Sequence, residues 1–429
     1  MENIQKSIFR QRKVTLSNDK LFLIISLFLV LFTIYRNSWL PGGLYWVAKE
    51  NFMIVLLTVT LILVAMDFSK IFYFKLRLKS EYFGLYTLFI LSFISVIINF
   101  SNEFVNLYNI IRFITFILYL FLYFLYLPSI IKIKKKYFIT FIRFYAILGF
   151  WIGSIGLIMY IISFVPFDLY TRGTNYISIT IHPNYVSFLL TATIVASLYY
   201  FLENKDKFNI FGKIFYFISF IIQVISQFLT LSRGGFIGTS IGIFLMLLFY
   251  YRKKIFLIFP VIIAISYYFV TTIFTTKGIA SNISRLLLLI PVYYMLMEKS
   301  VHTFFGFGIT NSFEAYTNYR IDYGVIEQVN NPHNSILSMF IMFGIIFTIC
   351  FLIFFIGLII KGFLYSFRSS DKINKLFYGY LTASLMALAV HGIFESALIM
   401  PEYFEMQLFL LSLGLLFLYT RKKNKFSYI

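Results

Sequence analysis

The amino-acid sequence predicts an all-α polytopic membrane protein with about twelve transmembrane helices. Of the 429 residues, 60% are hydrophobic and only 13% are charged, whereas soluble domains average about 25% charged residues. Apolar runs of roughly 20 residues, the length that crosses a bilayer, recur along the chain, and Lys and Arg collect in alternate loops between them. A water-soluble fold has no way to bury this much apolar surface, so the bilayer is the expected solvent.

The expected spans follow one another with short loops and one longer gap. We expect them at 20–36, 51–67, 83–100, 109–128, 138–165, 184–202, 213–231, 235–251, 255–275, 335–360, 376–397 and 405–420. The first run lacks a small-residue cleavage site, so we interpret it as a signal anchor. We recognise no internal repeat and no soluble domain. The prediction is therefore a single membrane domain over 1–429, with a large extracytoplasmic loop at 276–334.

The basic residues predict the orientation. With twelve spans, most of the 37 Lys and Arg residues fall in the two termini and in alternate loops, which the positive-inside rule places in the cytoplasm. The many Phe, Ile, Lys and Asn residues suggest an AT-rich bacterial genome, so the expected location is the bacterial cytoplasmic (inner) membrane. The net charge is +20, but charges placed in this way are topology signals and contacts for anionic lipid. We therefore expect no nucleic-acid partner.

Few cations are expected on the outer side, so each cation there needs an explanation other than the orientation of the chain in the membrane. Arg233 lies in Thr230-Leu-Ser-Arg-Gly-Gly235, a break between two apolar runs. A charge at membrane depth costs about 2.5–3.5 kcal/mol on insertion scales, and the forked guanidinium suits phosphate oxygens. The two glycines permit a ligand to approach closely. The pattern favours anion binding; the alternative is an arginine that reaches the interface beside a tight hairpin.

Arg285 is the second cation of this kind. It follows Ser284, a residue type common at helix N-caps, and precedes four leucines. We expect it to begin a helix on the outer surface, which Pro291 would kink or shorten. The alternative is an interfacial helix anchored by one cation.

His333 lies in Asn331-Pro-His-Asn334, directly before an apolar run. Proline at this place marks a helix start, and an imidazole, mostly neutral at pH 7, can take a proton from a hydroxyl group. His182 precedes Pro183 in the same way at the start of another span. For both histidines the alternative is a role in capping the helix or at the interface.

The remaining polar residues leave two possibilities open. Arg172 and Arg320 are candidates for contacting an acidic or sugar substrate, and ordinary solvation is the alternative. His391 and Glu395 are spaced i, i+4, so they would share a helix face, either for function or to satisfy one another. The outer-loop acids have no metal-ligand spacing, and the sequence has no P-loop and no dinucleotide glycine motif. We expect neither a metal nor a cofactor.

Taken together, these motifs resemble the O-antigen ligase and polymerase superfamily of bacterial envelope glycosyltransferases. The resemblance is carried, in order, by Thr230–Gly235, Arg285-x3-Leu289, Phe305–Gly308, and Pro332–Asn334 with Gly344 eleven residues after His333. It covers the layout of most of the chain, and sequence detail from about 182 to 350.

This resemblance implies a GT-C-like, metal-independent, inverting glycosyltransferase that uses a polyprenyl-diphosphate-linked donor at the outer face of the membrane. His333 would be the catalytic base, and Arg233 and Arg285 would bind the diphosphate. The candidate substrate-binding residues are Arg172, His182, Arg320, Asn334, His391 and Glu395. The implied partners are the lipid-linked oligosaccharide, a glycan acceptor, the lipid bilayer, a flippase and a chain-length regulator.

Several functions share these features. We favour a repeat-unit polymerase that makes capsule or O-antigen. A ligase that passes the glycan to lipid A core or another terminal acceptor would use the same residues. A transporter or flippase of lipid-linked glycan predicts polar residues near the middle of the membrane, whereas here they collect toward the outer side. A structural or sensory membrane protein is the remaining alternative.

Overall fold

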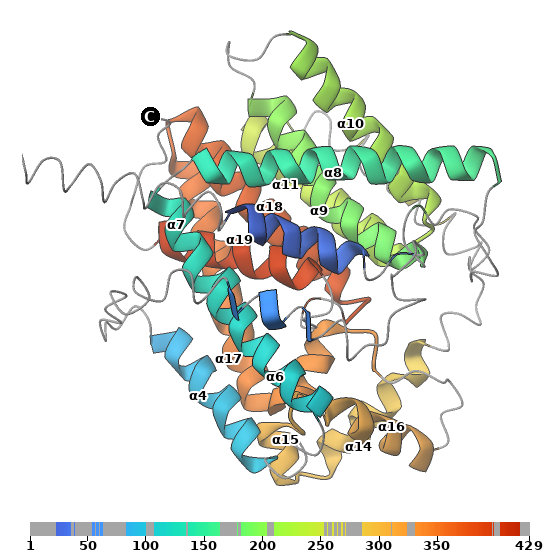
Figure 1. The fold of residues 1–429 in the computed structure, drawn as a ribbon, viewed down its shortest axis with the longest axis vertical. Helices are drawn as coiled ribbons and strands as arrows, with labels where there is room; N and C mark the ends of the chain where they lie inside the picture. Colours follow the sequence, from blue (N-terminus) through green and yellow to red (C-terminus); the bar gives the residue numbers. More distant parts are fainter. Residues whose placement is uncertain are drawn as a thin grey trace, which may run out of the picture.

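A computed structural model of the chain describes most of its predicted helices. The described residues are 23–35, 83–99, 107–133, 136–163, 182–203, 210–252, 285–309, 311–323, 331–396 and 404–420, with scattered positions at 38, 54–62, 178, 255–271 and 398. Within these residues the protein is all-helical and has no β-strand. Figure 1 shows the helices as one bundle, with the short helices α14, α15 and α16 gathered at one end.

The helices divide into long apolar segments and short connecting ones. Their bounds are α4 Phe83–Ile98, α6 Leu107–Tyr119, the π-helix η2 Leu120–Tyr126, α7 Leu127–Ile133, α8 Lys136–Ile161, α9 Pro183–Glu203, α10 Ile210–Leu229, α11 Arg233–Tyr251, α14 Leu289–Met297, α15 Val301–Phe305, α16 Ser312–Asp322, α17 Ser335–Arg368, α18 Lys372–Gly392 and α19 Phe404–Thr420. A short apolar helix, Leu23–Tyr35, precedes them.

The helices confirm the prediction of a polytopic helical membrane protein. Seven are long and apolar enough to cross a bilayer, and each coincides with an expected span. The spans expected at 20–36, 83–100 and 405–420 form shorter apolar helices. Most of the spans expected at 51–67 and 255–275, the far N-terminal and C-terminal residues, and much of 276–334 lie outside the described residues. The number of twelve spans and the orientation stay predictions.

Helix α9 is the centre of the bundle. It packs against α8, α10, α11 and α18, and 89% of the residues in its most hydrophobic stretch are buried inside the protein. Helix α10, by contrast, exposes isoleucine and phenylalanine side chains, and apart from Tyr216 its buried residues are polar: Ser219, Gln223, Ser226 and Gln227. An apolar exposed face and a polar buried face are expected of a helix at the lipid boundary, because polar side chains there can form hydrogen bonds only with other helices.

The polar face of α10 joins α9 through hydrogen bonds between neutral side chains. The amide of Gln223 donates to Ser197 Oγ of α9 at 2.7 Å and to Ser219 Oγ, one turn earlier in α10, at 2.8 Å. The amide of Gln227 donates to Ser187 Oγ at 2.7 Å. We call these five residues the α9–α10 seam; all are buried.

Helix α17 is interrupted at Gly344. This residue has φ 79° and ψ 174°, so the helix bends there and the span expected at 335–360 is not a single straight helix. The segment after α15 lies against the break: Phe307 N donates to Ile341 O at 2.8 Å and Gly308 N donates to Met342 O at 3.0 Å. Any side chain at position 344 would meet the backbone of Phe304. The glycine is therefore required twice, by its φ angle and by this close approach.

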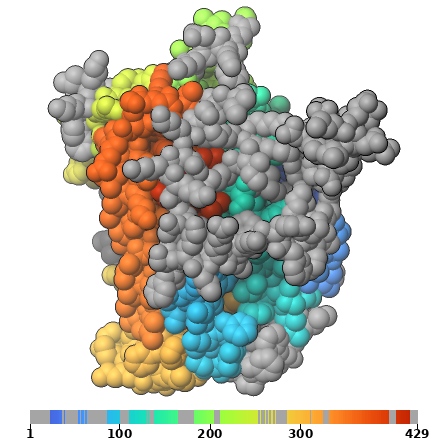
Figure 2. All heavy atoms as spheres, turned by 90° about the vertical axis from the view of Figure 1, so that its left-hand side faces the viewer, coloured from blue at the N-terminus to red at the C-terminus, as the bar shows by residue number. Residues whose placement is uncertain are grey.

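The contact at Gly344 places the short helices at one end of α17. In Figure 2 the helices α14–α16 lie beneath α17 and beside α4, in agreement with Figure 1. Helix α4 also holds the contact, because Asn99 Nδ2, directly after it, donates to Gly306 O at 3.0 Å and Ser95 Oγ donates to Met342 O at 2.9 Å. Helix α4 and the segment after α15 thus both pack against the break in α17.

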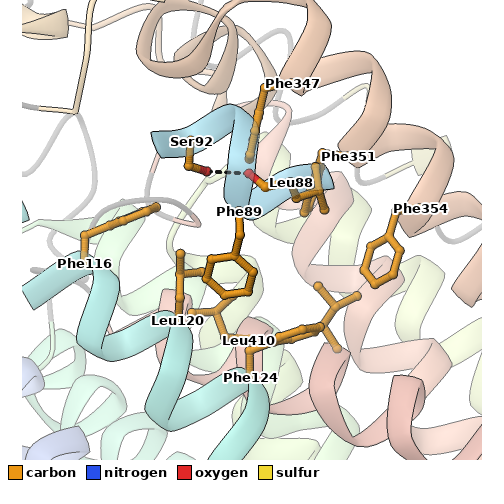
Figure 3. A pocket seen from close by; sticks show the side chains of 11 residues that line it. Leu88, Phe89, Ser92, Phe116, Leu120, Phe124, Phe347, Phe351, Phe354 and Leu410 are labelled. Atoms are coloured by element: carbon orange, nitrogen blue, oxygen red, sulfur yellow. Dashed lines mark hydrogen bonds between the residues drawn. The ribbon is translucent and has the colours of Figure 1, made fainter. Parts of the chain in front are cut away.

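Two apolar hollows lie beside α4. One, with a volume of about 70 Å³, is lined by side chains of α4, α6, η2, α17 and α19, among them Phe89, Phe116 and Phe351 (Figure 3). Its one hydroxyl group, on Ser92, donates to Leu88 O at 2.8 Å. The other, of about 550 Å³, lies between α4 and α6 and has a similar apolar lining. Chemically, both suit only apolar chains.

Candidate functional site

Glu395 is the centre of a group of polar side chains from separate parts of the chain. It follows α18 and its side chain is 13% exposed. One carboxylate oxygen accepts a hydrogen bond from Asn184 Nδ2 and lies 3.6 Å from Arg285 Nη2. The other lies 2.9 Å from His333 Nδ1. We call these four residues the Glu395 cluster.

The backbone around His333 holds the imidazole toward Glu395. His333 has φ 47°, and its N–H donates to Asn331 Oδ1 at 2.9 Å. Asn334 is the N-cap of α17, because its Oδ1 accepts from Ile336 N at 2.9 Å and from Leu337 N at 3.1 Å. The predicted helix start after Pro332 is therefore confirmed. The side chain of Asn334 is used for capping.

The Glu395 backbone is tied to the same loop. Ser335 Oγ donates to Glu395 O at 2.6 Å, and Ser396 Oγ donates to Asn331 Oδ1 at 3.0 Å. These bonds join the end of α18 to the start of α17 on both sides of the carboxylate. The distance between Glu395 and His333 is consequently set by backbone-anchored contacts rather than by two flexible side chains alone.

The charges of the cluster keep Glu395 ionised. Burial raises the pKa of this carboxyl group, but the neighbouring His333, Arg285 and His182 outweigh burial and lower the pKa to about 2. An ionised carboxylate only accepts hydrogen bonds, so His333 Nδ1 carries the hydrogen. The imidazole is 25% exposed, and its Nε2 is left to exchange a proton with a ligand.

Arg285 provides a cation beside this pair. Its Nη1 donates to Phe394 O at 3.2 Å, in the turn that leads to Glu395. Arg285 begins an apolar helix that is interrupted at Leu288, so that α14 begins at Leu289 and Pro291 lies in its first turn. The expectation that Pro291 shortens the helix is confirmed, since proline is tolerated in a first turn and not further along. Ser284 lies outside the described residues.

Arg233 provides a second cation. It is the first residue of α11 and is 7% exposed. The break predicted before it is confirmed: α10 ends at Leu229, Leu231 has φ 51°, and Ser232 is the N-cap of α11, accepting from Gly235 N at 3.4 Å. The guanidinium groups of Arg233 and Arg285 are near enough to repel one another. Two positive charges thus lie near one another, and one of them, on Arg285, lies 3.6 Å from the Glu395 carboxylate.

His391 does not join Glu395 in the way that their spacing predicts. Helix α18 ends at Gly392, so Glu395 lies beyond the helix. The prediction that His391 and Glu395 share a helix face is therefore wrong. His391 is fully buried, and its Nδ1 lies 3.0 Å from Thr191 Oγ1. Glu395 instead turns back toward His333 and Arg285, because Phe394 N donates to His391 O and reverses the chain.

The other candidates divide by position. His182 Nδ1 accepts from Asn184 N at 3.1 Å, so this histidine caps the start of α9, near enough to Glu395 for its protonated form to lower the pKa of that carboxyl group. Arg320 lies in the last turn of α16, and the contacts of Glu395 do not include it. Arg172 lies outside the described residues.

Sequence reasoning missed two asparagines that complete the site. Asn184 contacts the Glu395 carboxylate, and Asn331 links the His333 backbone to Ser396. Their signal was present, because each is next to a His-Pro or Pro-His pair at a helix start. Among the described residues, no group of three or more His, Cys, Asp and Glu side chains is arranged to hold a metal ion.

Comparison with known proteins assigns no family to this chain. No protein-family model matches it, and no curated protein does. The site therefore has to be interpreted from its own chemistry: two guanidinium groups suited to an anion, and one imidazole, oriented by a carboxylate, suited to a proton transfer.

Proposed function

We propose that the protein is a polysaccharide repeat-unit polymerase of the bacterial cytoplasmic membrane. It would transfer a glycan from a polyprenyl diphosphate to another lipid-linked glycan at the outer face, as a multi-pass enzyme of about twelve spans with a GT-C-like fold. The observation that carries the proposal is the Glu395 carboxylate, which contacts both His333 and Arg285. A general base and an anion-binding cation thus lie on either side of one anchoring group.

In this proposal His333 acts as the base. A hydroxyl group of the acceptor sugar attacks the anomeric carbon, and its proton passes to His333 Nε2 as the new C–O bond forms. Glu395, ionised and bonded to Nδ1, keeps the imidazole in the tautomer that can accept this proton and stabilises the imidazolium that results. Attack from the face opposite the leaving group inverts the anomeric configuration.

Arg285 and Arg233 would bind the leaving group. The bond between the anomeric carbon and the diphosphate oxygen breaks, and negative charge develops on the diphosphate. Forked guanidinium donors in a site partly closed to water stabilise this charge more than they stabilise the bound substrate. The two cations would take the place of the divalent ion that many glycosyltransferases use. We therefore expect EDTA to leave the activity of the purified enzyme unchanged.

A gel of surface polysaccharide from a deletion strain tests this proposal. Loss of a polymerase should leave single repeat units on the usual terminal acceptor. Polymer that stays on its lipid carrier would indicate the ligase function instead, and loss of all surface glycan with units trapped on the cytoplasmic side would indicate a flippase. Complementation with Glu395→Gln should fail to restore chain growth if the carboxylate orients the base.

A further inference from the structure

His391 lies where two rows of small residues meet. Along α18, Gly379, Ala383, Ala387 and His391 recur every fourth position, and Gly234, Gly238 and Gly242 do so along α11. The two helices pack closely: a side chain added at Gly238 would come within 2.5 Å of Ala387 O, and one at Gly242 within 3.0 Å of Ala387 Cβ. His391 takes the fourth place in a row that otherwise has no side chain larger than a methyl group.

The imidazole of His391 fills the space beside the first turn of α11. A side chain added at Gly234 would lie 2.7 Å from Phe394 Cβ and 2.9 Å from His391 Cδ2. One added at Gly235 would meet Ser187 and Gln227 first and would lie 3.0 Å from His391 Cε1. The ring edge that carries Nε2 therefore faces the two glycines that follow Arg233. In the part of the chain that the structure describes, this buried Nε2 has no hydrogen-bond partner.

The ring is fixed from its other sides. It stacks on Phe188 of α9 with 3.6 Å between ring centroids and 2° between planes. Thr191 Oγ1 directs its single hydrogen to Ser187 O at 2.8 Å, with Gly235 O more distant at 3.5 Å. The hydroxyl oxygen must then accept from His391 Nδ1–H at 3.0 Å, which leaves the Nε2 lone pair facing α11.

We propose that His391 is a positioning residue for Arg233. Its imidazole, fixed by Thr191 and Phe188, sets the distance between the first turn of α11 and α18. That distance in turn determines how deeply the Arg233 guanidinium is buried beside Arg285. The physical reason is size. Where the row has glycine or alanine the helices approach closely, and where it has histidine the ring separates them. That Arg233 binds a diphosphate rests on the proposed function. That His391 sets the position of residue 233 does not.

Thiol labelling tests the position directly. Cys350 is the only cysteine of the chain, so a Cys350→Ser parent allows a single cysteine to be placed by Arg233→Cys. Arg233 is 7% exposed, so labelling of the detergent-solubilised parent by a maleimide should be slow. Adding His391→Ala should change that rate by about tenfold, because the first turn of α11 loses its support. The matched control is Ala383→Gly, two turns before His391 in α18, which should leave the rate unchanged.

Two outcomes would overturn the inference: equal labelling rates with and without His391→Ala, or the same change with Ala383→Gly. If His391→Ala does not fold, His391→Asn replaces it, because the asparagine amide can still donate to Thr191 while leaving the ring space empty. It should also change the labelling rate, and an unchanged rate counts against the proposal.

A double-mutant cycle tests the link to function. With farnesyl diphosphate as the probe, His391→Ala should weaken binding by about tenfold in the native background and have no further effect in an Arg233→Gln background. Equal weakening in both backgrounds would show that His391 does not act through Arg233. If the native protein does not bind farnesyl diphosphate, the proposed function fails, and the labelling rates still decide whether His391 positions residue 233.

Discussion

The Glu395 cluster and the α9–α10 seam are both polar, yet they differ in charge and in what they can do. The seam consists of serines and glutamines in the middle of helices, all buried and bonded mainly to one another. The cluster lies at helix ends, is partly exposed, and brings together an acid, an imidazole and a guanidinium. Neutral polar groups in a membrane bundle join helices, whereas ionisable ones are retained for function.

The strongest test of this contrast is His333→Ala. We expect activity to fall by about 10²- to 10⁴-fold, the usual contribution of a general base, while the amount of protein in the membrane stays near that of the native protein. His302→Ala is the matched control, because His302 contacts Gly306 O and Phe307 rather than the cluster. Normal polysaccharide in the His333 variant would remove the catalytic role.

A smaller loss is expected from Arg285→Lys. The lysine keeps the charge but has a single nitrogen, which cannot take the places of both Nη1, bonded to Phe394 O, and Nη2, which lies 3.6 Å from Glu395. Activity in a glycan-transfer assay should fall on the order of tenfold to a hundredfold. Arg320→Lys, outside the cluster, should retain full activity. Equal activity of the two variants would contradict the diphosphate-binding role.

The charge of the cluster should also make stability depend on pH. Glu395 has a folded-state pKa of about 2, below the value near 4.3 that is usual for an unfolded chain. Its ionised form therefore stabilises the fold fully above about pH 4.3, and this stabilisation is lost as the pH falls toward 2. The difference in thermal midpoint between the native protein and Glu395→Gln should be constant from about pH 7 to 5 and shrink below about pH 4. A difference that does not change with pH would be inconsistent with an ion pair.

The smallest effect is expected in the seam. Gln223→Leu removes the hydrogen bond to Ser197 of α9 and the one to Ser219 within α10, and a bond between membrane helices contributes about 0.6 kcal/mol. The thermal midpoint should fall slightly and the activity should not change. A loss of activity without a loss of stability would assign the seam a function that its neutral side chains do not suggest.

The cluster was only partly predictable from the sequence. His333, Arg233 and Arg285 stood out because polar residues are rare among so many apolar ones, and because glycine and proline next to them mark helix ends. Glu395 was predicted to lie beside His391, which is wrong, because the helix was expected to continue to 397 and ends at Gly392. Asn184 was not selected, because an asparagine at a helix start usually has only a capping role.

The sequence by itself determined the membrane class, the helix starts after Ser232 and Asn334, and the residue types available for chemistry. These follow from hydrophobicity, cap residues and backbone preference, which act over a few neighbouring positions. Only the tertiary structure decided that Glu395 joins His333, Arg285 and Asn184, which are up to 211 residues away along the chain. Such a partnership depends on how whole helices pack, and the spacing of residues along the chain carries no record of it.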